Sequence, residues 1–348
     1  MEAVFQQAAS ALSSQDYRAA EHGFQSVLKS QPNNVAALGN LGVVYSRTHR
    51  YAEAIEVYRR ALRIAPGDKG LTTNLGLAFV KQERYAPALP LFEKLAADPH
   101  DLQAREMLAA CRLSLGQLEP AVAVLEPLQA TDPKNAGVLY MLGVALTRLK
   151  RTDEAHAAFA KMMDAVSPAQ ANFLMGKASY ETGSFEEAAA FLRQALKADP
   201  ELKAAHRELG KTLVSLRDND AAQKELRQAG SDDAEALYFL GAVLAQAHQA
   251  EAIPILTKAQ ALNPDFWGPL YYLGRIHLEQ DHPKQALAFL ERAAKLNPDE
   301  PAIQYQLGGA LRKSGREAEA RAAFARVKQL KAASLKSEID VLSPLPTR

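Results

Sequence analysis

Apolar residues recur at steps of three and four along almost the whole chain. Within residues 35–62, Leu38 and Leu41 belong to one such stripe, and a second stripe runs from Tyr51 to Tyr58. This period places the apolar side chains on one face of a helix. A few polar residues separate the two stripes. The segment is therefore predicted to form two amphipathic helices joined by a short turn.

The same two-helix pattern repeats along the chain, because an alanine recurs at spacings of 33 or 34 residues, with one spacing of 30. The series consists of Ala20, Ala54, Ala88, Ala121, Ala155, Ala188, Ala222, Ala252, Ala286 and Ala320. A second small residue precedes each of them, and these are Ala8, Gly42, Gly76, Ala109, Gly143, Gly176, Gly210, Gly241, Gly274 and Gly308. Glycine is unfavourable inside a helix unless packing requires it. We expect the two positions to meet where the helices of each hairpin cross.

Prolines follow most of these pairs of helices, often as Asn-Pro or Asp-Pro, and prevent the second helix from continuing. In the second repeat the order of key residues is Leu41, Gly42, Tyr45, Ala54, Tyr58, Ala61 and Pro66. This order resembles the tetratricopeptide repeat, and the resemblance covers about residues 1–333. It implies an all-α solenoid of about ten helical hairpins that forms a right-handed superhelix, in which the first helix of each hairpin lines a concave groove.

We place the repeats in one continuous array over residues 1–333, followed by a C-terminal capping helix and tail over 334–348. The repeats span about residues 1–34, 35–68, 69–101, 102–135, 136–168, 169–202, 203–233, 234–266, 267–300 and 301–333. The seventh repeat lacks its proline, so its second helix is predicted to be short and to interrupt the regular stacking. Leu335, Ile339 and Leu342 continue an apolar stripe and are expected to cover the last hairpin.

Candidate catalytic and metal-binding motifs all have simpler explanations within the repeats. Gly210, Lys211 and Thr212 imitate the end of a phosphate-binding loop, but the first glycine of that motif is Ala205, and the segment is predicted to be helical. The eight histidines show no metal-ligand spacing, and Cys111, as the single cysteine, lies in an amphipathic stripe. We therefore predict no enzymatic activity, no metal and no cofactor.

Composition and charge leave a protein-binding role as the leading interpretation. The formal net charge is only +1, which argues against a general attraction to nucleic acid or to an anionic membrane. The chain shows neither a secretory signal nor an apolar stretch long enough for a membrane span. If Met1 is the natural start, we expect a cytoplasmic protein.

The resemblance also indicates which residues face a partner, because groove residues occupy the second, fifth, sixth, ninth and twelfth positions of each repeat. The fifth position carries a series of mostly aromatic side chains, and cations accompany it at the ninth and twelfth. The predicted groove residues are Asn40, Asn74, Tyr140, Phe173, Lys177, Tyr180, Arg207, Lys211, Tyr238, Tyr271, Arg275, Tyr305 and Arg312. Rings on rigid helices offer contact area at little cost in entropy, and neighbouring cations can pair with carboxylates.

Three functions remain open at this stage. The first is a non-catalytic scaffold whose groove binds a protein or an extended peptide, for which an acidic segment would suit the cations. The second is a binder of single-stranded nucleic acid or another anionic polymer, since aromatic and basic residues are interleaved. The third is a structural scaffold that associates with itself. An alternative explanation of the rings is that they pack between neighbouring first helices, and acidic Glu181, Glu208, Glu235 and Glu279 lie near the same face.

Overall fold

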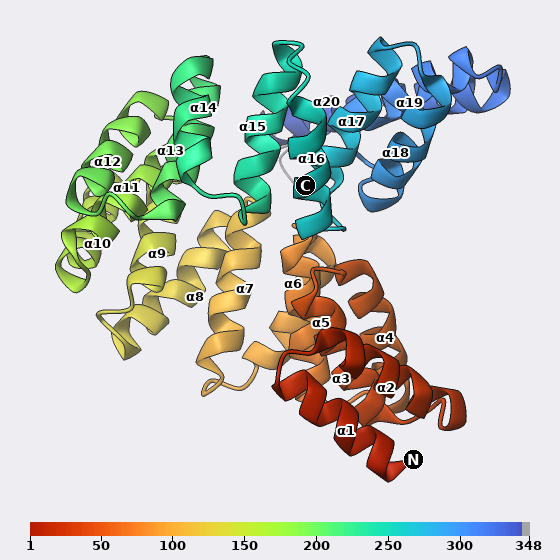
Figure 1. Ribbon diagram of the computed structural model, residues 1–348. Coiled ribbons are helices and arrows are strands. Elements are labelled where there is room, and N and C mark those ends of the chain that lie inside the picture. Colours follow the sequence, from red (N-terminus) through yellow and green to blue (C-terminus); the bar gives the residue numbers. More distant parts are fainter. Residues whose placement is uncertain (343–348) are drawn as a thin grey trace, which may run out of the picture. The chain divides into compact units, whose positions relative to one another are not determined.

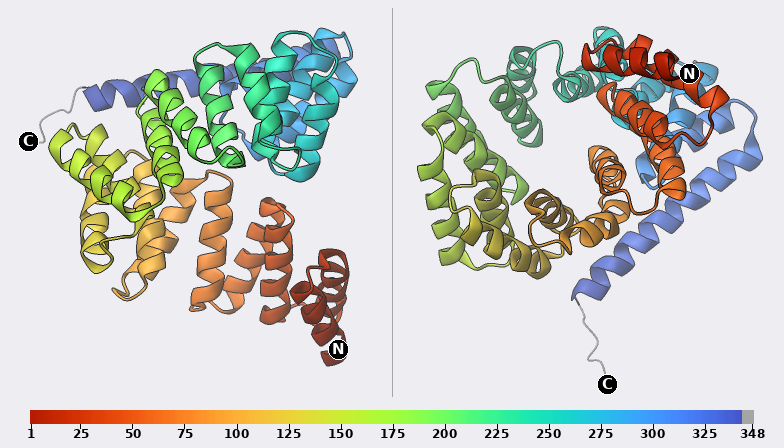
Figure 2. Two further views of the ribbon diagram at one scale, coloured as in Figure 1. Left: turned by 60° about the vertical axis from the view of Figure 1, so that its left-hand side comes forward. Right: turned by 90° about the horizontal axis from the view of Figure 1, so that it is seen from below.

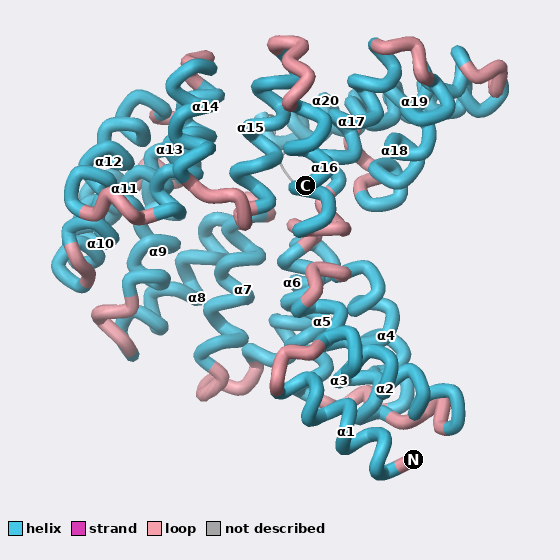
Figure 3. Tube along the Cα trace, viewed as in Figure 1, coloured by secondary structure: helices cyan, strands magenta, loops and turns pink. Residues whose placement is uncertain are grey.

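A computed structural model describes the backbone of residues 1–342 and the side chains of residues 1–332. The described residues form twenty helices and no strand, and short turns join the helices (Figure 3). The chain divides into two compact units, Met1–Gly230 and Ser231–Arg348. The division falls in the irregular seventh repeat, whose short second helix was predicted to interrupt the regular stacking. We call these the N-terminal and C-terminal units and describe each by itself.

The N-terminal unit consists of seven hairpins of antiparallel helices, which Figure 1 shows side by side in chain order. Its helices are α1 (Glu2–Ser13), α2 (Tyr17–Ser30), α3 (Val35–Arg47), α4 (Tyr51–Ile64), α5 (Lys69–Lys81), α6 (Tyr85–Ala96), α7 (Leu102–Ser114), α8 (Leu118–Thr131), α9 (Ala136–Arg148), α10 (Thr152–Ala165), α11 (Pro168–Glu181), α12 (Phe185–Ala198), α13 (Lys203–Ser215) and α14 (Asn219–Gln228). As predicted, α14 is short, with 10 residues against 14 in α12.

The C-terminal unit contains three further hairpins. Its helices are α15 (Ala234–Gln246), α16 (Ala252–Leu262), α17 (Trp267–Glu279), α18 (Pro283–Leu296), α19 (Pro301–Lys313) and α20 (Glu317–Leu342). The residues assigned to the capping helix, from 334 on, continue α20 without a break up to Leu342 (Figure 2). No glycine or proline between Glu317 and Leu342 interrupts it. The contacts proposed for Leu335, Ile339 and Leu342 and the tail at 343–348 lie outside the described residues.

Short polar residues start most of the odd-numbered helices. Asn34 Oδ1 accepts a hydrogen bond from the Ala37 amide at 3.0 Å, and Asp68 Oδ1 accepts one from the Leu71 amide at 2.9 Å. Asp101 and Asn135 cap α7 and α9 in the same way. These caps satisfy amides that have no partner within the helix. In these four repeats the Asn or Asp that follows the proline turn therefore fixes where the next hairpin begins.

The alanine series is buried throughout, with exposed fractions of 2% or less at all ten positions. The glycine series faces a different residue from the one predicted. A Cβ on Gly42 would lie 2.4 Å from Cε1 of Tyr58, and one on Gly76 would lie 2.7 Å from Cζ of Phe92. The glycine therefore makes room for the large residue four positions after the alanine, and not mainly for the alanine itself. Leucine takes that place opposite Gly176, Gly210, Gly241 and Gly274.

The first repeat meets the same steric demand with the small residues exchanged. Ala8 occupies the glycine position, and Gly23 of α2 accommodates its methyl group, since a Cβ on Gly23 would lie 2.6 Å from that of Ala8. The hairpin thus keeps one glycine at the crossing, but on the other helix.

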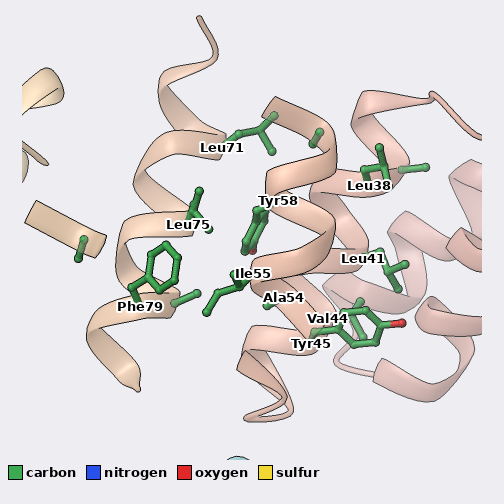
Figure 4. Close-up of a cluster of buried hydrophobic side chains, with 14 of the residues drawn as sticks. Leu38, Leu41, Val44, Tyr45, Ala54, Ile55, Tyr58, Leu71, Leu75 and Phe79 are labelled. Carbon is green, nitrogen blue, oxygen red and sulfur yellow. The ribbon is translucent and has the colours of Figure 1, made fainter. Parts of the chain in front are cut away.

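Large apolar side chains fill the space between successive hairpins. Leu71, Leu75 and Phe79 of α5 lie beside Ile55 and Tyr58 of α4 in Figure 4, and all five are buried. The same core continues through neighbouring hairpins from Ala8 to Cys111. Because this packing holds the even-numbered helices against the odd-numbered ones, it fixes which side chains the odd-numbered helices present on their free face.

Candidate partner-binding surface

The predicted groove residues from Tyr140 to Arg312 are divided between the two units. In the N-terminal unit they lie on α9, α11 and α13. In the C-terminal unit they lie on α15, α17 and α19. We call the first set the α9–α11–α13 surface; it consists of Tyr140, Phe173, Lys177, Tyr180, Arg207 and Lys211.

Tyr140, which was predicted to face a partner, is largely covered by its neighbours. Its side chain is buried, with 9% exposed, and its hydroxyl donates a hydrogen bond to Glu181 Oε1 at 2.6 Å. Burial raises the pKa of the phenol above its ordinary value, and the Glu181 carboxylate raises it further. The fifth position of this repeat thus supports the surface from below.

Lys177 lies above this buried ring. Its ammonium nitrogen is 5.5 Å from the centroid of Tyr140 and 5.9 Å from the centroid of Phe173, within the range of cation–π attraction. Phe173 and Lys177 are both half-buried. The structure therefore brings together three of the predicted residues from α9 and α11.

Tyr180, Arg207 and Lys211 form the neighbouring part of the surface. The Lys211 ammonium lies 4.7 Å from the Tyr180 ring centroid. Glu208 is buried between the two cations of α13, 3.1 Å from Arg207 Nη2 and 3.7 Å from Lys211 Nζ. The sequence identified Glu208 as an acidic neighbour but not as their common ion-pair partner.

An open pocket of about 510 Å³ adjoins Tyr140 and Glu181. Its apolar lining comes from Ala110 and Leu113 of α7 and Met141 of α9, and Arg148 stands at the end of α9. Arg148 was not among the predicted groove residues. It occupies the thirteenth position of its repeat, as Glu181 does in the next one, one position beyond the last assigned to the groove.

In the C-terminal unit the predicted aromatic residues are mostly engaged in packing between repeats. Tyr238 is half-buried, its ring centroid is 4.8 Å from that of Phe266, and its ring covers Gly268 so closely that a Cβ there would lie 2.6 Å away. Tyr271 is half-buried and packs against a core cluster that includes Ala310 and Leu311 of α19. These rings follow the alternative explanation given above.

The cations and the last ring of this unit are arranged differently. Arg275 lies over the Tyr272 ring at 4.8 Å and pairs with Glu279 at 3.3 Å. Tyr305 is the most exposed of the predicted rings at 60%, and Arg312 is exposed beside Phe324. This unit therefore presents one exposed ring, while its other predicted rings are packed.

Asn40 of α3 and Asn74 of α5 are half-buried at equivalent positions. Neither side chain hydrogen-bonds to another of the described residues. They lie two hairpins and more before α9, so they are not part of the α9–α11–α13 surface.

The described residues hold no cluster of three or more His, Cys, Asp or Glu side chains that could bind a metal ion. Cys111 is fully buried, and burial raises the pKa of its thiol to about 11, which keeps it protonated near neutral pH. None of the described helices combines the length and the apolar character that crossing a bilayer requires.

An all-α solenoid is defined by three features: the repeated hairpins, the buried alanine series and the free face that the odd-numbered helices share. A tetratricopeptide repeat model matches residues 5–69, 140–203 and 271–334, and a second one matches 179–247 and 243–294. The chain belongs to the tetratricopeptide repeat family, whose members act as protein-interaction scaffolds. A model for anaphase-promoting complex, cyclosome, subunit 3 also matches residues 81–162.

Two solved structures illustrate the similarity. A crystal structure of MamA protein is 24% identical and covers 49% of this chain and 94% of its own, with a TM-score of 0.41. The Cut9 and Hcn1 hetero-tetramer of the APC/C is 13% identical and covers 84% of this chain and 59% of its own, with a TM-score of 0.47. No curated protein sequence matches the chain.

Proposed function

We propose that this chain is a non-catalytic scaffold that binds a segment of another protein on the α9–α11–α13 surface. The observation that carries the proposal is the gathering of half-buried rings and cations from consecutive odd-numbered helices. Phe173 and Tyr180 are held on a packed framework, so a partner can bury their free area without first ordering them.

Charge favours a protein segment over nucleic acid. The α9–α11–α13 surface contains cations interleaved with rings, which is the pattern of single-strand binders. However, Glu208 already pairs with Arg207 and Lys211, and Glu181 adds another negative charge next to Tyr140. Both carboxylates would repel the closely spaced negative charges of a polyanion. A protein segment can place its own charges selectively.

Peptide selection tests this function. Displayed random peptides are selected on the wild-type full chain and then measured against Phe173→Ala and Phe173→Gln. We expect the selected peptides to lose about tenfold or more in affinity, as burial of an aromatic anchor implies. Gln194→Ala, on the exposed face of α12, is the matched control and should bind as the wild type does.

Circular dichroism melting of each variant shows that the fold is retained. Unchanged peptide affinity in both folded Phe173 variants would refute the proposed surface. A labelled single-stranded oligonucleotide provides the comparison with the second function. Tight binding that weakens steeply with salt and depends on Phe173 would replace the protein partner with a nucleic acid.

A further inference from the structure

The four cations in and beside this surface differ in how far their charge is already compensated. Arg207 and Lys211 share the buried carboxylate of Glu208 at 3.1 and 3.7 Å. Lys177 has no carboxylate oxygen within 4.0 Å among the described residues, and only two rings contact its ammonium group. Attraction to an acidic partner must therefore depend on Lys177 more than on the α13 pair.

Arg148 is the second uncompensated cation. Its Nη1 donates to the carbonyl oxygen of Leu113 at 3.1 Å, and no carboxylate of the described residues pairs with it. This hydrogen bond holds the guanidinium group at the edge of the 510 Å³ pocket without neutralising it. Arg148 of α9 thus lines the pocket directly. Lys177 of the neighbouring helix α11 lies over Tyr140, which lines the same pocket.

Tyr140 and Glu181 connect these elements. Tyr140 lines the pocket and supports the ammonium of Lys177, and its own position is set by the hydrogen bond to Glu181. Because only Oε1 of Glu181 receives this hydrogen bond, the second oxygen can accept a main-chain amide of a bound segment. Glu181 thus offers an acceptor for the main chain of a bound segment, and the carboxylates of that segment must lie closer to Lys177 and Arg148 than to Glu181.

We propose that the pocket beside Tyr140, together with Lys177 and Arg148, recognises an acidic protein segment in which an apolar side chain is flanked by carboxylates. The apolar side chain enters the pocket against Ala110, Leu113 and Met141, and the flanking carboxylates pair with Lys177 and Arg148. The inference rests on the proposed function and specifies the partner's chemistry. Charge complementarity carries it, since half-buried Lys177 has lost part of its hydration and no carboxylate among the described residues pairs with it.

Two peptide pools provide the test with the full chain. Both consist of acetylated and amidated peptides with a central leucine, which glutamate flanks in one pool and glutamine in the other, and the remaining positions are random. We expect the glutamate pool to bind about tenfold more tightly, which corresponds to one hydrogen-bonded charge pair. In Lys177→Met this preference should fall to about threefold, because methionine keeps the apolar stem but lacks the charge, and Arg148 remains.

Lys197→Met provides the matched control, since Lys197 is exposed on α12 of the same hairpin and is not part of the pocket lining. It should retain the full preference, and Arg148→Met should retain part of it. Equal binding of both pools by the wild type, or an unchanged preference in Lys177→Met, would overturn the inference. If Phe173→Ala weakens both pools equally while charge has no effect, the proposed function stands and only the inference fails.

Discussion

Replacing Phe92 with alanine is expected to lower the free energy of unfolding by about 3–5 kcal/mol, the usual cost of removing a fully buried ring. Phe92 has no exposed area, and its ring fills the space that Gly76 leaves open on the facing helix. Urea unfolding followed by circular dichroism measures the loss. A change below about 1 kcal/mol would show that the ring is not packed as described.

Gly76→Ala supplies the matching half of a double-mutant cycle. Alone, it should cost about 1–3 kcal/mol, because the new methyl group meets the Phe92 ring. In the Phe92→Ala background the same change should stabilise the protein by up to about 1 kcal/mol, since alanine favours the helix and the obstructing ring is gone. Additive effects of the two substitutions would contradict the contact between these positions.

Replacing Tyr140 with phenylalanine should lower the free energy of unfolding by about 2 kcal/mol near neutral pH, as expected for a hydrogen bond to a charged acceptor. The ring remains, so the support for Lys177 is kept. The loss arises from Glu181, whose carboxylate no longer receives the phenol. Tyr305→Phe is the matched control, because Tyr305 is 60% exposed, and it should leave stability unchanged.

The effect of Tyr140→Phe should also depend on pH. In the folded protein the pKa of Tyr140 is raised above the ordinary value of about 10, first by burial and then by Glu181. Below this ordinary value both states keep the proton, so the stabilisation is complete. At higher pH the unfolded state releases it first, and the wild-type advantage falls by about 1.4 kcal/mol per pH unit. Unfolding curves at about pH 7 and about pH 11 measure the difference, and a constant difference would contradict the assignment.

The repeats could be predicted because one residue type recurs at a nearly constant spacing. Every alanine of the series is buried, and the first helix of each hairpin begins within one residue of the start of its repeat. The short second helix of the seventh repeat followed from its missing proline. These features are local, since small residues, caps and prolines act within one or two turns of helix.

Features that depend on side-chain direction were harder to predict. The glycine and the alanine share a spacing, but only the structure shows that the glycine faces Tyr58 or Phe92 and not mainly the alanine. Only the structure shows that one helix, α20, continues from Glu317 to Leu342.

The sequence predicted which residues lie on this surface, but not which of them are buried or paired with a carboxylate. The resemblance placed Phe173 and Lys177 on one face, and the structure brings them together. It could not show that Tyr140 is buried while Tyr305 is exposed, because both occupy the fifth position of a repeat. Nor could it distinguish Lys211, which pairs with Glu208, from Lys177, which pairs with no carboxylate of the described residues, since that difference depends on where the Glu208 carboxylate lies.

Site-specific photo-cross-linking in the native cell tests the central claim most directly. A benzophenone amino acid replaces Phe173 on the α9–α11–α13 surface in one sample and Gln194 on the exposed face of α12 in another. We predict that the probe at Phe173 cross-links to a partner protein and that the probe at Gln194 does not. Cross-links to a partner protein from Gln194 but not from Phe173 would place binding on another face and contradict the account.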